Sequence, residues 1–266
     1  MNSADRLLGI LRLFTVAKPV WTVEDAAKEL GVSLSQTYRY FNSLVKAGLL
    51  DSAVGVACFT LGPAFLEYDR QIRLCDPMLT AARQIMDEIA RHAPEAATVL
   101  LCRRYHDRVM CVHQVVGPAA PTAVPYQRGR PMPILHGAAS KAILAHLSSR
   151  HLKRLFRDHQ DEIAKAGLGT SWEGFRNGLG RIRRQGYAHS VAEVEPGGAG
   201  ISAPVFDEKG VVMGSLGFAL PADGMTDSLV RRLAALSAAA AQEIQAAMTT
   251  QPAVPADEAS PLRATG

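Results

Sequence analysis

The stretch from Ala192 to Gly210, AEVEPGGAGISAPVFDEKG, brings glycines and carboxylates together just before an apolar, strand-like run. A glycine-rich turn beside a strand can cradle phosphate groups, so nucleotide chemistry is the first hypothesis. That chemistry needs a Lys-Ser/Thr pair and a helix N-terminus after the glycines, and the sequence has neither here. Gly197, Gly198 and Gly200 instead allow a sharp turn and a close approach of the backbone to a small ligand. We expect the loop to form one wall of a ligand pocket, with Glu193 fixing it by accepting hydrogen bonds from backbone N–H groups.

The pair Ser140-Lys141, close to His136, is a second candidate for chemistry because it could supply a nucleophile and a base. Neighbouring residues on a helix point about 100° apart, so Ser140 and Lys141 do not face each other there. A helix start whose backbone N–H groups hold a carboxylate is the simpler interpretation. His106 and His113 flank a predicted hairpin without a third metal ligand at a useful spacing. We therefore predict no catalytic residue, no metal site and no cofactor.

The composition fits a globular protein with one large domain or two smaller ones, because the 266 residues are 48% hydrophobic and 20% charged. A net charge of +4 permits nucleic-acid binding without requiring it. Charges interrupt every apolar run well short of about 18 residues, and no N-terminal signal is visible, so we expect a cytoplasmic protein without a membrane partner. The cysteines lack paired spacing and are predicted to be reduced thiols: Cys58, Cys75, Cys102 and Cys111.

Residues 1–62 show the pattern of a winged helix-turn-helix. After a first apolar-striped helix, Thr22 begins a second helix that ends at Gly31. Ser33 then begins a third helix, which ends near Gly48, and a hairpin with its turn at Gly55 follows as the wing. Two helices joined by a tight glycine turn favour DNA binding, and a three-helix protein-interaction module is the alternative.

The third helix, LSQTYRYFNSLVKAG, is predicted to enter the DNA major groove because its outer face is polar and has no carboxylate. Residues 1–62 hold six Lys/Arg and five Asp/Glu, so a single copy makes few phosphate contacts, and an oligomer is expected. The apolar side collects Thr37, Tyr40, Phe41 and Leu44. The expected DNA contacts are Ser35, Gln36, Tyr38, Arg39, Asn42 and Lys46.

Residues 63–75 are predicted to form a linker helix that begins at Pro63. Its apolar side chains exceed what an exposed linker needs, and they are covered by a partner chain or by the chain's own second domain. Residues 76–249 alternate strand-like and helical segments in an order that predicts an α+β domain. The tail, residues 250–266, is rich in Pro, Ala and Thr and is predicted to be disordered.

Three segments carry a resemblance to a known family: GVSLSQTYRYFNSLVKAGLL, LHGAASKAILA and QGYAHSVAEVEPGGAGISAPVFDEKG. With them the chain resembles the IclR family of bacterial transcriptional regulators along nearly its whole length. The resemblance implies an N-terminal winged helix-turn-helix, a linker helix and a C-terminal effector-binding domain of GAF-like fold. In that domain a curved antiparallel sheet is flanked by helices.

The resemblance also implies that a small organic acid or aromatic catabolite binds as an effector in the C-terminal domain. Two departures from the family bear on its chemistry. The Leu-His segment is one residue shorter, and Gly217 and Ala219 stand where some acid-binding relatives have serines, which favours a larger, less polar ligand. Glu193 is predicted from the glycine loop itself, and the other effector-binding positions are those that the resemblance implies. The predicted effector-binding residues are Leu135, His136, Ala139, Ser140, Ser190, Glu193, Gly198, Gly200, Gly217 and Ala219.

The function predicted from these features is ligand-controlled binding to a near-palindromic double-stranded DNA operator, by a homodimer or homotetramer. The alternative is an enzyme of small-molecule metabolism whose N-terminal module serves only for oligomerisation. The sequence shows no base placed to activate a nucleophile, which argues against the enzyme hypothesis.

Overall fold

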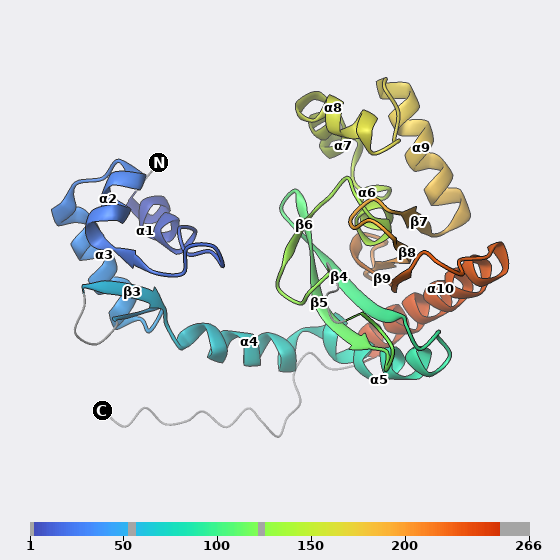
Figure 1. Cartoon of the computed structure of the whole chain (residues 1–266), viewed down its shortest axis with the longest axis horizontal. Helices are drawn as coiled ribbons and strands as arrows, with labels where there is room; N and C mark the ends of the chain where they lie inside the picture. Colours follow the sequence, from blue (N-terminus) through green and yellow to red (C-terminus); the bar gives the residue numbers. More distant parts are fainter. Residues whose placement is uncertain (1–2, 53–56, 122–125, 251–266) are drawn as a thin grey trace. The chain divides into compact units, whose positions relative to one another are not determined.

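The computed structural model describes residues 3–52, 57–121 and 126–250, which form two compact units divided between Cys75 and Asp76. The predicted wing turn at Gly55 and all of the predicted tail except Thr250 lie outside the described residues. Thr250 itself is the last residue of a helix. The two units are shown in Figure 1 and are described separately below.

The N-terminal unit has four helices and a small antiparallel sheet in its described part. The helices are α1 (Ser3–Leu11), α2 (Val23–Leu30), α3 (Leu34–Lys46) and α4 (Ala64–Cys75). The strands are β1 (Trp21–Thr22), β2 (Leu50–Ser52) and β3 (Cys58–Leu61), in the order β1-β3-β2. This is the predicted order of elements, with β1 as an addition.

The caps of α2 and α3 are the ones that the sequence indicates. The Thr22 side chain accepts a hydrogen bond from the Asp25 N–H at 3.1 Å, and Ser33 accepts one from the Gln36 N–H at 3.4 Å. Gly31 ends α2 with φ +62°, a left-handed conformation that favours glycine. The turn between α2 and α3 is therefore short, and α3 is fixed against α2 and α1 by a shared apolar core.

The helix α4 differs from the other helices of its unit because it has no buried residue. Pro63 accepts hydrogen bonds from the N–H groups of Leu66 and Glu67 and so opens the helix, as its position predicts. Leu66 and Ile72 are 76% and 54% exposed. An isolated helix would not keep such side chains in water without a reason, so α4 is a candidate for contact with another chain.

The C-terminal unit is built on a six-stranded antiparallel sheet with the strand order β6-β5-β4-β9-β8-β7. The predicted α+β class, a curved antiparallel sheet flanked by helices, is confirmed. The strands are β4 (Thr98–Tyr105), β5 (Arg108–Val116), β6 (Pro131–Pro133), β7 (Ala188–Val191), β8 (Gly198–Phe206) and β9 (Val212–Pro221). The helices are α5 (Pro77–Arg91), α6 (Ala138–Leu144), α7 (Ser149–Asp158), α8 (Gln160–Lys165), α9 (Trp172–Gln185) and α10 (Asp227–Thr250).

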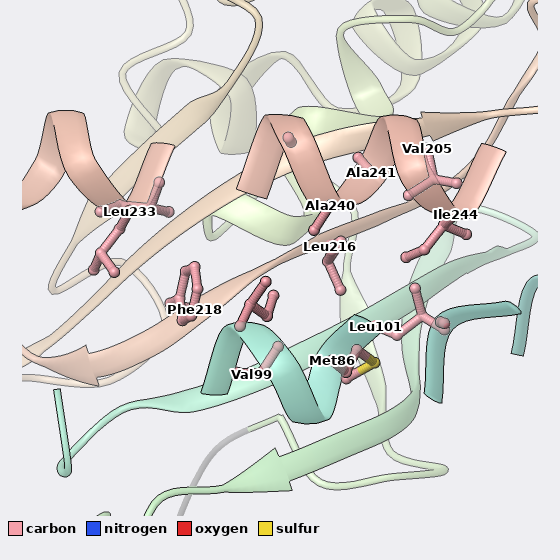
Figure 2. Close-up of a cluster of buried hydrophobic side chains, with 14 of the residues drawn as sticks. Met86, Val99, Leu101, Val205, Leu216, Phe218, Leu233, Ala240, Ala241 and Ile244 are labelled. Atoms are coloured by element: carbon pink, nitrogen blue, oxygen red, sulfur yellow. The ribbon is translucent and has the colours of Figure 1, made fainter. Parts of the chain in front are cut away.

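One face of this sheet packs on α5 and α10, which lie side by side (Figure 1). Large aliphatic and aromatic side chains at alternate strand positions fill this layer, as expected for a half-buried strand. Figure 2 shows Leu101, Leu216 and Phe218 from the strands meeting Leu233 and Ile244 from α10. Burial of this layer forms one of the two large apolar clusters that hold the domain together.

The other face of the sheet carries α6 to α9. A second apolar cluster joins β4 and β5 to these helices through residues such as Leu100, Ile143, Leu155 and Phe175. Next to it, α6 lies against β8 and β9, where the facing strand residues are small. The start of α6 therefore does not close completely on the sheet, and this is where the candidate ligand site lies.

Candidate functional site

The outer face of α3 is polar in the structure, as predicted. Its inner face is buried at Thr37, Tyr40, Phe41 and Leu44, which fixes the direction of the outer side chains. Gln36 differs from the other predicted DNA contacts because its amide is half-buried and donates a hydrogen bond to Tyr40 Oη at 2.6 Å. The exposed positions are Ser35, Tyr38, Arg39, Asn42 and Lys46.

Tyr38 joins α3 to α2, because its hydroxyl donates a hydrogen bond to Glu24 Oε1 at 3.0 Å. The hydrogen bond to the Glu24 carboxylate, and then its charge, raise the pKa of Tyr38, so the phenol stays a neutral donor at physiological pH. Glu24 belongs to α2, so α3 itself presents Arg39 and Lys46 without an acidic residue of its own. This face can accept the phosphates and base edges of a nucleic acid.

A cavity of about 200 Å³ opens between the sheet and the start of α6. Its floor is formed by two rows of strand residues in register. One row runs Thr98, Ala219, Gly200, Ser190 across β4, β9, β8 and β7. The other runs Leu100, Gly217, Ser202. The described lining further includes Pro121, Tyr126, Ala138, Ala139, Phe218, Pro221 and, from the glycine loop and β8, residues 193–201.

The floor residues are small, and the start of α6 approaches the floor closely at Gly200. A Cβ there would lie 3.3 Å from the Ala138 Cβ of α6 and 3.3 Å from Oγ of the neighbouring floor residue Ser190. Seven of the ten predicted effector residues line this cavity: Ala139, Ser190, Glu193, Gly198, Gly200, Gly217 and Ala219. The structure therefore brings together segments that are up to about 80 positions apart in sequence.

Three predicted effector residues do not line the cavity. Leu135 is buried in the apolar cluster of α6 to α9. Ser140, one helix position and about 100° from Ala139, is not among the lining residues and donates a hydrogen bond to the Pro133 carbonyl at 2.9 Å. His136 contacts the cavity wall only indirectly: its backbone carbonyl accepts a hydrogen bond at 3.4 Å from Oη of Tyr126, which lines the cavity.

Glu193 connects the glycine loop to the start of α6. Its Oε2 accepts a hydrogen bond from the Gly137 N–H at 3.0 Å, and its Oε1 lies 2.6 Å from Lys141 Nζ. Lys141 Nζ also donates to the Ala166 carbonyl at 3.1 Å. The expectation that Glu193 accepts from a backbone N–H group is therefore correct, but the donor belongs to α6 and not to the glycine loop.

Two N–H groups at the start of α6 are bound by the protein's own acceptors. Besides the bond from Gly137 to Glu193, the Ala138 N–H donates to Ser190 Oγ at 2.9 Å. A ligand carboxylate that binds these two N–H groups would have to displace Glu193 and Ser190. Ser140 and Lys141 each have separate partners, so the structure does not pair them as a nucleophile and a base.

Comparison with known proteins identifies both units. A family model described as "Bacterial transcriptional regulator IclR C-terminal" matches residues 76–246, and one described as "IclR helix-turn-helix domain" matches residues 3–52. The chain belongs to the IclR family. Since the family models and the curated relatives describe transcriptional regulators, this chain is a DNA-binding transcriptional regulator with an effector-binding domain, and the enzyme alternative is wrong.

Individual IclR relatives are similar over most of the chain. The HTH-type transcriptional regulator KipR of Bacillus subtilis is 25% identical, over 80% of this chain and 83% of KipR. An IclR transcriptional regulator from Silicibacter sp. TM1040 has a similar fold, with a TM-score of 0.78 at 19% identity, covering 96% of this chain and all of the other. An IclR homologue from Microbacterium hydrocarbonoxydans, solved with 4-hydroxybenzoate, has a TM-score of 0.74 at 19% identity, covering 94% of this chain and all of the other.

Sequence reasoning missed two polar residues of this IclR-family cavity, Thr98 and Ser202. Their hydroxyl oxygens are buried without a hydrogen-bond partner in the described structure. The available signal was the strand period of two, which places Ser202 on the same face as Gly200 and Thr98 on the same face as Leu100. Tyr126 was also missed; burial, followed by the nearby Cys102, raises its pKa, so its phenol is neutral.

Within residues 3–52, 57–121 and 126–250, no three His, Cys, Asp or Glu side chains gather in a way that could hold a metal ion. Over the same residues, no helix combines the length and the apolar character that crossing a membrane requires.

Proposed function

We propose that this IclR-family protein binds a near-palindromic DNA operator as a homodimer or homotetramer, and that a small organic acid or aromatic molecule in the C-terminal cavity changes its operator affinity. In this proposal residues 1–62 bind DNA, residues 63–75 link the domains and residues 76–249 bind the effector. The protein then acts in the cytoplasm, where operator DNA is found. Whether the effector strengthens or weakens binding depends on which state it prefers.

The observation that carries the proposal is the outer face of α3. A packed inner face holds this helix rigidly, and its exposed face offers two cations and several short polar groups without a carboxylate. Such a helix fits the major groove, where base edges are distinguishable. Gln36 reaches a base only after it releases Tyr40. The proposed base contacts are Ser35, Gln36 and Arg39, and the proposed backbone or flanking contacts are Tyr38, Asn42 and Lys46.

The homo-oligomer is supported by α4 and by the charge of the N-terminal unit. Leu66 and Ile72 project from a helix that buries nothing, and a second copy of α4 is a symmetric partner for them. Because residues 1–62 are almost neutral, a single unit gains little from phosphate contacts. Two units on two half-sites double the number of contacts and explain a palindromic operator.

The effector role is supported by the cavity and by one relative. The Microbacterium homologue binds 4-hydroxybenzoate, a small aromatic acid. The cavity described above has room for a molecule of similar class, and its wall is a loop that is anchored to α6 by Glu193. A ligand that contacts both the loop and α6 stabilises one arrangement of these segments over another, which is the requirement for control of a distant site.

The recognition helix is tested with an operator selected by the wild-type protein from random-sequence DNA. Arg39→Ala is expected to weaken binding to that operator by about tenfold to a hundredfold, which corresponds to about 1–3 kcal/mol, in fluorescence anisotropy at fixed salt. Lys28→Ala removes an exposed cation from α2 and is the matched control, with less than about threefold effect expected. Equal affinities of the Arg39 variant and wild type would overturn the assignment of α3.

A further inference from the structure

The charge of the cavity lining is negative in its described part. Glu193 and Glu195 both line it, and no lysine, arginine or histidine is among the described lining residues. The charge of Glu193 is balanced by Lys141, which lies outside the lining, so Glu195 supplies the excess negative charge. A carboxylate ligand entering this cavity meets like charge, which disfavours its binding.

The two groups that would otherwise attract a carboxylate are already occupied. Lys141 is paired with Glu193, with 2.6 Å between Nζ and Oε1, and also donates to the Ala166 carbonyl. Two N–H groups at the start of α6, those of Gly137 and Ala138, donate to Glu193 and to Ser190. The protein's own carboxylate thus takes one of the places at the helix start where an acid ligand could bind.

Two uncharged polar groups in the cavity have no partner in the described structure. Thr98 and Ser202 are 1% and 2% exposed, and the hydroxyl oxygen of each lacks a hydrogen bond. Buried hydroxyls almost always find a partner, so an unsatisfied pair in one cavity points to a ligand that satisfies them. A hydroxyl can donate or accept, and it therefore matches a carbonyl, an amide or another hydroxyl.

The remaining lining is mostly apolar or small. Leu100, Val194 and Leu220 add aliphatic surface, and the neutral ring of Tyr126 lies at the same cavity. A lining of this kind gains free energy by burying carbon, and a few polar groups then orient the ligand. The combination selects a compact ring-sized molecule with few polar atoms.

We propose that the cavity binds an uncharged, mainly apolar ligand whose carbonyl or hydroxyl group bonds to Thr98 and Ser202, and that it discriminates against carboxylic acids. The inference rests on the proposed effector role. It narrows the class of effector from a small organic acid or aromatic molecule to an uncharged, mainly apolar one. Glu193 is the group that sets this preference: it neutralises Lys141 and occupies the start of α6.

In the test, Ser202 is replaced by cysteine, and the rates at which two thiol reagents modify this cysteine are compared. The reagents are similar in size but differ in charge. The full-length chain carries Cys58→Ser and Cys75→Ser, because these thiols are partly or fully exposed while Cys102 and Cys111 are buried. The reagents are propyl methanethiosulfonate, which is uncharged, and 2-carboxyethyl methanethiosulfonate, which is an anion. In each case the thiolate attacks the sulfenyl sulfur, a mixed disulfide forms and methanesulfinate leaves, so the rates are directly comparable.

Each rate is divided by the rate of the same reagent with free cysteine. We expect the uncharged reagent to modify Ser202→Cys about tenfold faster than the anion on this normalised scale. Ser237→Cys is the matched control, because Ser237 is buried in α10 and is not among the described lining residues, and it should react with neither reagent. Adding Glu193→Gln, which leaves Lys141 without its carboxylate, should remove the preference; Glu195→Gln, at a half-exposed position, should reduce it.

The possible failures are distinguishable. Equal normalised rates, or a faster anion, would overturn the preference for uncharged ligands while leaving the cavity as an accessible effector site. Protection of Ser202→Cys from both reagents would overturn the effector role of the cavity and the inference with it. A preference that persists in both glutamine variants would refute the assignment of the discrimination to the carboxylates.

Discussion

The ion pair between Lys141 and Glu193 offers a quantitative test, because it links the glycine loop to α6 across the edge of the cavity. The two side chains are 8% and 22% exposed, and 2.6 Å separates Nζ from Oε1. Glu193→Gln keeps the size of the side chain and an acceptor for the Gly137 N–H, but leaves the buried ammonium with the Ala166 carbonyl alone. Lys141→Met leaves the carboxylate with the N–H alone.

Breaking a buried ion pair by removing one partner costs about 3–5 kcal/mol, because the other charge stays buried without compensation. For Glu193→Gln we expect about 3 kcal/mol, since Lys141 has little access to water. For Lys141→Met we expect about 2 kcal/mol, because water reaches the Glu193 carboxylate more easily. The double variant buries no charge and should cost about 2 kcal/mol, which gives a coupling energy of about 3 kcal/mol.

The measurement is urea unfolding followed by the fluorescence of Trp172, which lies in α9 of the same unit. All variants carry Trp21→Phe, so that the fluorescence comes from the C-terminal unit alone. Any loss of stability that Trp21→Phe causes in the N-terminal unit is then the same in every variant. A double-variant cost equal to the sum of the single costs would refute the reasoning. So would a Glu193→Gln cost below about 1 kcal/mol, because the pair would then behave like a surface pair.

Three further predictions concern the cavity, the oligomer and the pH dependence of stability. Gly200→Ala adds one methyl group at the cavity floor, 3.3 Å from the Ala138 Cβ, and should weaken effector binding in calorimetry, with the circular dichroism spectrum as the check of the fold; unchanged affinity would exclude Gly200 from the effector site. Leu66→Glu combined with Ile72→Glu should convert the protein to monomers in analytical ultracentrifugation, and an unchanged sedimentation coefficient would exclude α4 from the interface. Burial lowers the pKa of His146, so the unfolded chain binds its proton more strongly and stability falls as the pH drops below about 6.5. His146→Gln should reduce that loss in urea unfolding at pH 7.5 and 5.5, and an unchanged loss would contradict this cause.

The elements of the fold were predictable wherever a local signal marks an end. Thr22 and Ser33 each accept a hydrogen bond at the helix start that the sequence indicates, and Gly31 has the positive φ of a helix end. These signals act over three or four residues and need no knowledge of the rest of the chain. The strand order was beyond such signals, because β4 pairs with β9 across more than 100 residues and the pairing depends on burial of both strand faces.

The site was predictable at the level of segments and less so at the level of side chains. The resemblance to the family identified the glycine loop, α6 and β9 as neighbours, and residues such as Gly200 and Ser190 do face one cavity. A segment does not specify which helix position points inward: Ala139 lines the cavity, whereas the neighbouring Ser140 donates its hydroxyl to the Pro133 carbonyl. The partnership of Glu193 with Lys141 joins residues 52 positions apart, and only the packing of the loop on α6 creates it.

The two faces of the C-terminal sheet explain why a cavity survives in a folded domain. On the face toward α5 and α10, alternate residues such as Leu216 and Phe218 are large and pack closely (Figure 2), which contributes to the free energy of folding. On the opposite face Gly217 lies between them, and a Cβ there would meet the Ile201 carbonyl oxygen at 2.0 Å, so no side chain can fill the space from this position. The hydroxyls of Thr98 and Ser202 remain unsatisfied beside it, at a cost of about 1–3 kcal/mol each. A void and two unpaired hydroxyls on one face are tolerated because the other face is well packed, and a ligand that fills the void and bonds the hydroxyls recovers this cost as affinity.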